Sequence, residues 1–345
     1  MSLAKDLIDW YDVNRRHMAW REEPTPYHVY LSEIMLQQTQ VDTVRAYYDR
    51  FLKAFPTIND LANASEEQVL KLWEGLGYYS RGRNLHKAAL QIVSQYGGNI
   101  PDNSAELLSL PGIGAYTSRA ILAIAFHHKE IAVDGNLVRV YSRLQEDGEA
   151  NPETLKTSAE AFFKAQLSDV DPSSYNQALM DLGELVCLPK GDPLCSVCPL
   201  AAYCKAKANA SYLAYPPSKK PLQKKQEERT IFLLVYQGNV ALQKRPDVGL
   251  LASLYEFPNE VGNYSLAAVK KLAKDWGLDV KAITPLGQTT HTFSHLLWKL
   301  TGFRLDLKKQ PQRAYIWSTK DQLLNDYSIP SAFAFYKEAY LKGKP

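Results

Sequence analysis

The chain has 345 residues, 46% of them hydrophobic and 22% charged, and a formal net charge of +3. These values are close to those of globular proteins, and the length suits about two domains, which excludes collagen-like, disordered and disulfide-dense small proteins. The N-terminal stretch carries Lys5, Asp6 and Asp9 among its apolar residues, which argues against a signal peptide. No window reaches the roughly 20 apolar residues that span a bilayer, so we expect a cytoplasmic protein that does not bind membranes.

Residues 1–213 are predicted to form an all-α domain, because apolar residues recur at helical spacing in one segment after another. Ser65–Gln68 has the pattern of a capping box at the start of a helix, and Asn103–Glu106 has a similar spacing. The run Ala120–Phe126 is apolar on every face, which predicts a buried helix.

Two carboxylates stand out in this helical part. Glu33 lies in the largely apolar helix Val29–Thr39, and Asp134 follows an apolar stretch and precedes a new helix. Considered alone, Glu33 is better explained as a residue on a solvated helix face, and Asp134 as a helix N-cap. Together they offer what glycosidic cleavage needs, an acid that protonates the leaving group and an anion that stabilises an oxocarbenium-like centre.

A Gly-x-Gly turn, made by Gly112 and Gly114 within Leu110–Thr117, lies between a short capped helix and the buried helix. Such a turn at a helix start lets backbone amides approach a phosphate group, assisted by the helix dipole. The segment resembles a helix–hairpin–helix, which holds the DNA backbone without reading its sequence. In isolation, an ordinary turn between two helices explains it equally well.

All four cysteines lie close together, with the spacing Cys-x7-Cys-x2-Cys-x5-Cys. Four thiolates in one short segment suit a tetrahedral zinc ion or an iron–sulfur cluster, and the spacing does not choose between them. Two disulfides are the alternative, which an intracellular location disfavours. The segment therefore predicts a metal centre with the ligands Cys187, Cys195, Cys198 and Cys204.

Residues 214–228 are predicted to be a linker, because they are rich in Pro and Lys and poor in large apolar residues after Tyr215. Beyond them, β-like segments flank Gln237–Asn239 as in a hairpin, and a helix is predicted over Leu266–Trp276. Residues 229–345 are thus expected to form a smaller α/β domain. The chain as a whole is expected to combine an all-α domain with an α/β domain.

Five segments occur in order along the chain: Leu31–Thr39, Trp73–Arg81, Leu110–Thr117, Val133–Asn136 and the cysteine loop of residues 187–204. Together they resemble the adenine DNA glycosylases of the MutY type, in the endonuclease III-like helix–hairpin–helix superfamily, over nearly the whole chain. The resemblance implies a [4Fe–4S] cluster and hydrolytic removal of adenine mispaired with 8-oxoguanine or guanine in double-stranded DNA. The first cysteine gap is seven residues instead of the family's six, and a bulge in the Gly-Asp-Pro loop can accommodate the extra residue.

The resemblance also implies catalytic roles. Glu33 is expected to protonate the flipped adenine, and its apolar neighbours favour a raised pKa. Asp134 is expected to stabilise the sugar cation, and Tyr116 is expected to help orient the Asp134 carboxylate. Asn136 is expected to hydrogen-bond either this carboxylate or the attacking water. Bifunctional relatives carry a lysine where this chain has Tyr116, and because a phenol cannot form an imine, we expect no strand cleavage by that route.

Further residues are expected to contact DNA by the same resemblance. They are Arg21 and Gln177 in the adenine pocket, Gln37, Gln38 and Thr39 at the plug that fills the vacated stack, Gly112 and Gly114 at the phosphate backbone, and Tyr78 as a wedge beside 8-oxoguanine. A core aromatic is the alternative for Tyr78.

The C-terminal part resembles the Nudix-like domain of the same family through Gly249–Pro258. A working Nudix hydrolase holds magnesium with glutamates on the helix before a Gly-Leu pair. Here the helix before Gly277 carries lysines, so nucleotide hydrolysis is not expected. The loop Thr292–His295 resembles the family's 8-oxoguanine-sensing loop, with Phe293, Ser294 and His295 as its contact residues. An ordinary turn serine is the alternative for Ser294.

Three functions remain to be compared. The favoured one is a mismatch-specific glycosylase of base excision repair, acting as a nucleoid-associated monomer. A glycosylase for a pyrimidine lesion is disfavoured by Tyr116 and by the C-terminal domain. A non-catalytic iron–sulfur DNA-binding protein would not need both Glu33 and Asp134.

Overall fold

The structure, a computed structural model, describes residues 2–217 and 224–343. The chain forms two compact units, one of Met1–Asn63 and Asn84–Lys220, the other of Ala64–Arg83 and Pro221–Pro345. Residues 218–223, in the middle of the predicted linker, lie outside the described residues. Within the described ranges, no helix has the length and apolar character needed to cross a bilayer.

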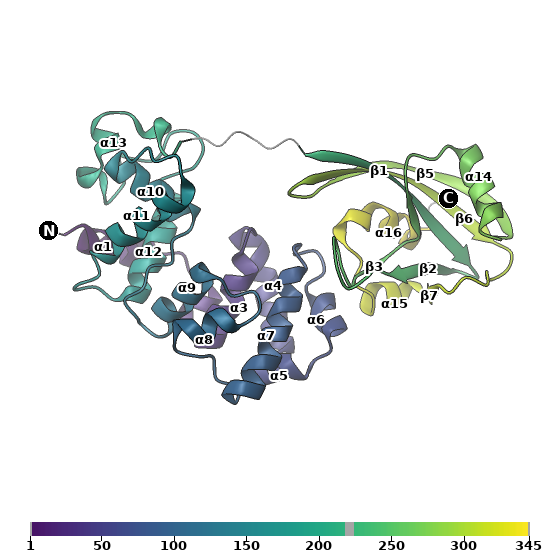
Figure 1. The fold of residues 1–345 in the computed structure, drawn as a ribbon, viewed down its shortest axis with the longest axis horizontal. Coiled ribbons are helices and arrows are strands. Elements are labelled where there is room, and N and C mark those ends of the chain that lie inside the picture. Colours follow the sequence, from purple (N-terminus) through teal and green to yellow (C-terminus); the bar gives the residue numbers. More distant parts are fainter. Residues whose placement is uncertain (1, 218–223, 344–345) are drawn as a thin grey trace. The chain divides into compact units, whose positions relative to one another are not determined.

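The first unit is helical (Figure 1). Its elements are α1 (Leu3–Asn14), α2 (Ala19–Glu22), α3 (Pro26–Leu36), α4 (Val41–Ala54), α5 (Ile58–Asn63), α7 (Ser80–Tyr96, whose first turn belongs to the second unit), α8 (Ser104–Ser109), α9 (Ala115–Ala125), α10 (Gly135–Gln145), α11 (Pro152–Lys164), α12 (Pro172–Leu185), α13 (Lys205–Ala208) and the 3₁₀ turns η1 (Ala201–Tyr203) and η2 (Tyr212–Ala214).

Helix α12 organises one half of this unit, because α1, α9 and α10 all pack against it. Its residues Tyr175, Ala178, Leu179 and Leu182 recur at helical spacing and are buried in a common core. Helix α9 also packs against α3 and α8. Residues 120–124 of α9 are all buried, which confirms the buried helix expected from the apolar run. Helix α9 thus contacts both α3, which carries Glu33, and α12, which carries Gln177.

The start of α9 requires glycine in the preceding turn. Gly112 has φ +81°, and a Cβ at this position would lie 2.8 Å from the Cβ of Asn84. Gly114 is the N-cap of α9. The turn between α8 and α9 therefore runs close to α7, and the exposed glycines Gly112 and Gly114 keep its backbone accessible.

The second unit combines a mixed sheet with helices. Its elements are α6 (Glu66–Leu72), β1 (Lys225–Tyr236), β2 (Asn239–Lys244), β3 (Tyr255–Glu256), β4 (Asn259–Val261), α14 (Leu266–Asp275), β5 (Val280–Thr292), β6 (Leu296–Leu307), β7 (Ile316–Ser318), α15 (Lys320–Asn325), η3 (Ser331–Phe333) and α16 (Ala334–Leu341). The capping box predicted at Ser65 is present at the start of α6.

The sheet has the strand order β3-β2-β1-β6-β5, with β4 paired to β1 and β7 to β2. Strands β1 and β6 are parallel, from Lys225 opposite Leu296 to Val235 opposite Asp306, and the other pairs are antiparallel. Strand β1 therefore begins inside the predicted linker, because its first residues pair with β6. The predicted hairpin is confirmed, with positive φ at Gln237 and Gly238 as two-residue hairpin turns prefer.

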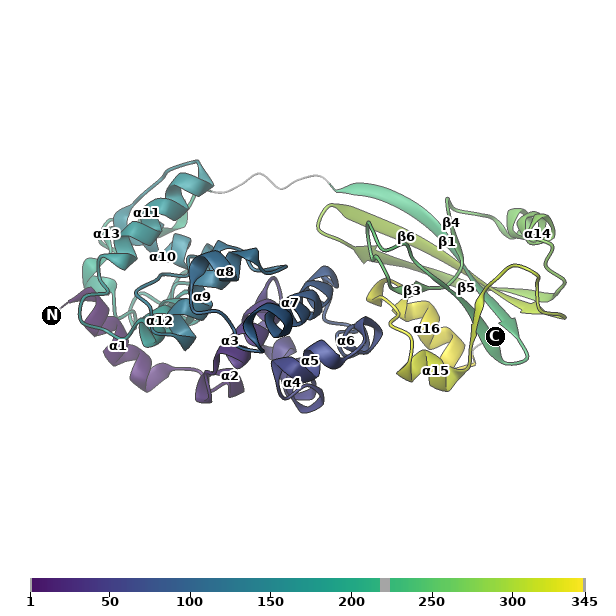
Figure 2. The ribbon, with the colours of Figure 1, turned by 60° about the horizontal axis from the view of Figure 1, so that its bottom comes forward.

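Both faces of the sheet are covered, with α14 on one face and α15, η3 and α16 on the other (Figures 1 and 2). Along β1, Ile231, Leu233 and Val235 belong to the core beneath α16, whereas Phe232 and Leu234 belong to the core beneath α14. A strand buried on both sides needs apolar residues at consecutive positions, which explains the continuous apolar run in the sequence.

Candidate active site

A cavity of about 360 Å³ lies in the first unit. Its walls include residues of α2, α3, α9 and α12 and the N-terminus of α10. Seven of the predicted site residues line this cavity, although they lie up to 156 positions apart in the sequence. They are Arg21, Glu33, Thr39, Tyr116, Asp134, Asn136 and Gln177.

Glu33 lies on α3 and is only 6% exposed. The alternative explanation, that Glu33 lies on a solvated helix face, is therefore wrong. Burial raises the pKa of Glu33 to about 7. A hydrogen bond from Tyr116 and the charge of Arg21 oppose the increase, and the charge of Asp134 adds to it. A large fraction of Glu33 is therefore a neutral acid near pH 7.

Asp134 is the N-cap of α10, as its ordinary explanation predicted, and it also faces the cavity. One carboxylate oxygen accepts the Leu137 N–H at 2.8 Å and the other accepts the Asn136 side-chain amide at 3.1 Å. Burial raises the pKa of Asp134, and the backbone N–H groups of Leu137 and Asn136 oppose that effect by stabilising the anion. Capping thus fixes the orientation of this carboxylate.

Tyr116 and Asn136 connect the two carboxylates to their surroundings. The Tyr116 hydroxyl donates to Glu33, whereas the sequence had suggested Asp134 as the group that it orients. Burial and the charges of both carboxylates raise the pKa of Tyr116, so it remains a phenol donor. Asn136 donates to Asp134, the partner predicted for it, and accepts from Arg139 at 2.8 Å.

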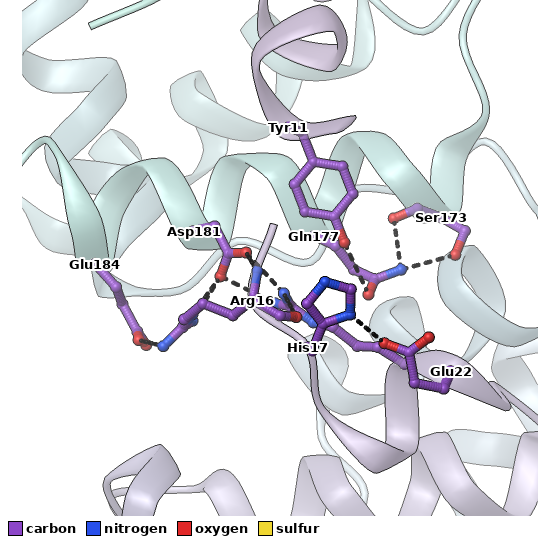
Figure 3. Close-up of polar contacts among 9 residues, drawn as sticks. Tyr11, Arg16, His17, Glu22, Ser173, Gln177, Asp181 and Glu184 are labelled. Atoms are coloured by element: carbon purple, nitrogen blue, oxygen red, sulfur yellow. Dashed lines mark hydrogen bonds and ion pairs between the residues drawn. The ribbon is translucent and has the colours of Figure 1, made fainter. Parts of the chain in front are cut away.

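An ionic cluster that the sequence analysis missed forms part of the cavity wall, and Figure 3 shows its polar contacts. Asp181 of α12 is completely buried and accepts from Arg21 Nη1 at 2.7 Å, from Arg16 Nε at 2.8 Å and from Arg16 Nη2 at 2.6 Å. Glu184 accepts from Arg16 Nη1 at 2.6 Å. Arg21, which lines the cavity, is therefore held in place by the Asp181 carboxylate.

Gln177 is oriented by the same helix face. Its side-chain oxygen accepts from the Tyr11 hydroxyl at 3.3 Å, and its amide donates to the Ser173 hydroxyl at 3.1 Å (Figure 3). Gln177, Asp181 and Glu184 follow the spacing i, i+4, i+7, a polar stripe on an otherwise buried helix. That stripe was the sequence signal that could have revealed the cluster.

The expected plug lies at the C-terminal end of α3. Gln37 is the C-cap of this helix, and its amide donates to the Thr117 hydroxyl at 3.2 Å, which ties the end of α3 to α9. Gln38 is exposed and has φ +57°, an uncommon conformation for a residue other than glycine. Gln37 and Gln38 therefore form a sharply turned segment beside Thr39 at the cavity.

The four cysteines are free thiols that line one small cavity against α10 and α12. Arg143 Nη1 donates to the Cys187 sulfur at 3.3 Å, and Arg139 Nε donates to the Cys187 carbonyl at 2.8 Å. The seven-residue gap after Cys187 closes on itself, because Leu194 N donates to Val186 O at 2.9 Å. The longer gap leaves all four sulfurs around a common space.

A second cavity, of about 500 Å³, lies within the second unit. Its lining includes the predicted wedge and sensing-loop residues Tyr78, Phe293, Ser294 and His295. The hydroxyl groups of Tyr78 and Ser294 are 3.3 Å apart, and Tyr78 is 47% exposed, so it is not a core aromatic. Phe293 packs edge-on against Trp298, and Lys224 donates to its carbonyl at 2.9 Å.

Residues 31–165 match the family described as HhH-GPD superfamily base excision DNA repair protein, and residues 230–338 match the NUDIX domain. The chain is 34% identical to the adenine DNA glycosylase of Rattus norvegicus over 98% of this chain and 78% of that protein. It is also 34% identical to the adenine DNA glycosylase of Buchnera aphidicola, over 84% of this chain and 82% of that protein. A solved thermostable thymine-DNA glycosylase, 27% identical, superposes with a TM-score of 0.54 and covers 60% of this chain and 95% of its own.

These similarities confirm the predicted combination of a helix–hairpin–helix glycosylase fold and a Nudix-like domain. The length of the matches and the residues around the first cavity lead to the same assignment: the chain belongs to the adenine DNA glycosylase family.

Proposed function

We propose that this protein is a monofunctional adenine DNA glycosylase that removes adenine mispaired with 8-oxoguanine or guanine in double-stranded DNA. The observation that carries the proposal is that Glu33 and Asp134 face one cavity, with Glu33 buried and its pKa raised to about 7. We further propose that it acts as a monomer at the nucleoid, in the cytoplasm.

The first step is protonation of adenine. The glycosidic bond is inaccessible inside a duplex, so the nucleotide must leave the stack and enter the cavity. Glu33 then donates its proton to a ring nitrogen of the base, which turns adenine into a better leaving group. Arg21 and Gln177 line the same cavity with fixed orientations and are suited to hydrogen-bond the base edge.

The second requirement is stabilisation of the positive sugar that remains. Asp134 supplies a carboxylate whose orientation is fixed by its own helix cap and by Asn136. A water molecule completes the hydrolysis, and the ionised Glu33 is a base that can activate it. Tyr116 cannot form an imine with the sugar, so the product is an abasic site in an intact strand.

A [4Fe–4S] cluster is the group that we propose for the cysteine loop. Four thiolates can hold either a zinc ion or an iron–sulfur cluster, and the resemblance to the adenine DNA glycosylases favours the cluster. The four sulfurs around one cavity, with Arg143 donating to Cys187, suit a larger cluster in a structural role.

The cavity of the second unit is proposed to recognise 8-oxoguanine. Ser294 can donate and accept hydrogen bonds, which suits the altered edge of an oxidised guanine. Tyr78 lies beside it, exposes an aromatic face and is supported by Arg81, whose guanidinium carbon is 5.4 Å from the Tyr78 ring centroid. The pair therefore offers a hydrogen-bonding group and a stacking surface in one place.

The proposed activity is tested on a duplex that carries one adenine opposite 8-oxoguanine. Strand breakage should appear only after hot alkali, because the enzyme leaves an abasic site. Breakage without alkali would contradict the monofunctional mechanism, and an unchanged duplex would favour a non-catalytic DNA-binding protein.

Replacing Glu33 with Gln should lower the single-turnover excision rate by about 10² or more, because the amide keeps the size of the side chain but cannot deliver a proton. Binding to the mispair, measured by gel shift or fluorescence anisotropy, should persist. Near-normal excision by the Glu33→Gln variant would exclude Glu33 as the acid.

Excision should also depend on pH with a defined sign. Glu33 acts as the protonated acid and has a pKa of about 7, so the rate should be greatest below this value and fall about tenfold per unit above it. The same raised pKa destabilises the folded protein as pH rises from 4.5 to about 7. Glu33→Gln should therefore unfold at a higher temperature than wild type at pH 8, with a smaller difference at pH 5. An excision rate that rises above pH 8 would contradict the assignment of Glu33 as the acid.

The cluster proposal predicts a yellow-brown protein with broad absorption near about 400 nm and iron bound to the four cysteines. Cys198→Ser should reduce both the iron content and the soluble yield, because metal binding is coupled to folding. A colourless protein with one zinc ion per chain would contradict the cluster and leave the glycosylase activity as a separate question.

Ser294→Ala should lower the preference for 8-oxoguanine over guanine by up to about tenfold, because one hydrogen bond contributes about 0.5–1.5 kcal/mol and neighbouring loop atoms retain part of the contact. Adenine excision opposite guanine should be little changed. The measurement compares single-turnover rates on the two duplexes. A point variant is preferable to removal of residues 221–345, because Ala64–Arg83 pack in the same unit and would lose their partners.

A further inference from the structure

Residues Ala64–Arg83 form part of the second unit, although they lie inside the segment that matches the helix–hairpin–helix family. Four side chains of this segment bond to residues beyond 240. Lys71 donates to the Tyr327 carbonyl at 2.9 Å, Arg83 donates to the Ala252 carbonyl at 2.5 Å, and Glu67 and Glu74 accept from lysines. The segment is therefore attached to the C-terminal fold at both of its ends.

Glu74 joins two lysines of the second unit. Its carboxylate accepts from Lys71 at 2.6 Å and from Lys337 of α16 at 2.5 Å, and all three side chains are no more than 19% exposed. Burial lowers the pKa of Lys71, and the carboxylate of Glu74 opposes that effect. Loss of this carboxylate would leave two half-buried cations without their shared anion, which is costly in such surroundings.

The turn after Glu74 is internally hydrogen-bonded and carries Tyr78. The Trp73 indole donates to the Gly77 carbonyl at 3.0 Å, and the backbone N–H of Gly75 donates to the Tyr79 hydroxyl at 3.1 Å. Gly77 has φ +76°, a conformation that favours glycine. A displacement at Glu74 is therefore transmitted along a short, internally bonded turn to the Tyr78 ring.

We propose that Glu74 is a positioning residue for lesion discrimination: by joining Lys71 and Lys337, it holds the 73–79 turn so that Tyr78 faces Ser294. The inference rests on the proposed recognition of 8-oxoguanine in this cavity and adds the group that sets its geometry. Glu74 does not line the cavity. It acts through Tyr78, so its loss should affect the choice between opposite bases and leave adenine cleavage intact.

A second ion pair between residues 64–83 and the C-terminal fold provides a matched control. Glu67 accepts from Lys244 at 2.9 Å, but these side chains are 49% and 40% exposed. Exposed ion pairs contribute little to stability because water screens them. Glu67→Gln removes the same charge from the same segment, and we expect no effect on discrimination.

The test compares wild type, Glu74→Gln and Glu67→Gln on duplexes that carry adenine opposite 8-oxoguanine or opposite guanine. Glu74→Gln should lower the ratio of the two single-turnover rates by about three- to thirtyfold, the usual range for substitutions that couple through neighbouring contacts. Its rate opposite guanine should stay within about twofold of wild type. Without DNA, amide hydrogen exchange of residues 76–80 should be faster in Glu74→Gln and unchanged in Glu67→Gln.

Two results would overturn the inference: a wild-type preference that Glu74→Gln retains, or an equal loss of excision opposite both bases. A wild-type protein without any preference for 8-oxoguanine would instead contradict the proposed function of the cavity. If Glu74→Gln does not fold, Lys337→Gln breaks the contact from the other side and should lower the preference in the same direction. The double variant should be no worse than Glu74→Gln alone, because both changes remove one interaction.

Discussion

The site is built around a carboxylic acid that is kept away from water. Glu33 lies on the inward face of α3, and its burial favours the neutral form of the side chain. Tyr116 and Arg21 pull in the opposite direction, and their balance with burial brings the pKa to about 7. Asp134 faces the same cavity and accepts two N–H donors, which stabilise its anionic form.

The charged groups beside Glu33 are themselves paired in ionic contacts. Asp181 has no exposed surface, yet it is bonded to two guanidinium groups, which offsets the cost of desolvating it. The pairing also fixes Arg21 next to Glu33. On the other side, Arg139 bonds both Asn136 and the carbonyl of Cys187, so the cysteine loop and the cap of Asp134 share a hydrogen-bonded partner. The positions of Glu33 and Asp134 thus depend on helices that meet only in the folded unit.

In the second unit, a sheet that is covered on both faces supports an exposed loop. Phe293 is anchored by Trp298 and Lys224, and Ser294 next to it is left accessible. The unit also includes a segment from the middle of the glycosylase family match, residues 64–83. Tyr78 and Ser294 are 216 positions apart and reach the same cavity only because this segment packs with the C-terminal fold.

The sequence by itself determined the elements that depend on local interactions and on apolar patterning. The capping box at Ser65, the buried helix around Ala120–Ile124 and the two-residue hairpin at Gln237 all follow from neighbours within a few positions. The sequence also suggested Glu33 and Asp134 as a pair, from the two carboxylates that glycosidic cleavage needs. Their chemistry is carried by residue type, which the sequence records directly.

Only the tertiary structure decided which groups meet. The partners of Arg21 and Arg16 lie 160 or more positions away on α12, and no local pattern links them. The attachment of residues 64–83 to the C-terminal unit depends on side chains such as Glu74 and Lys337, which no sequence motif singled out. Burial turns these charges into specific contacts, because a half-buried charge needs a partner and an exposed one does not.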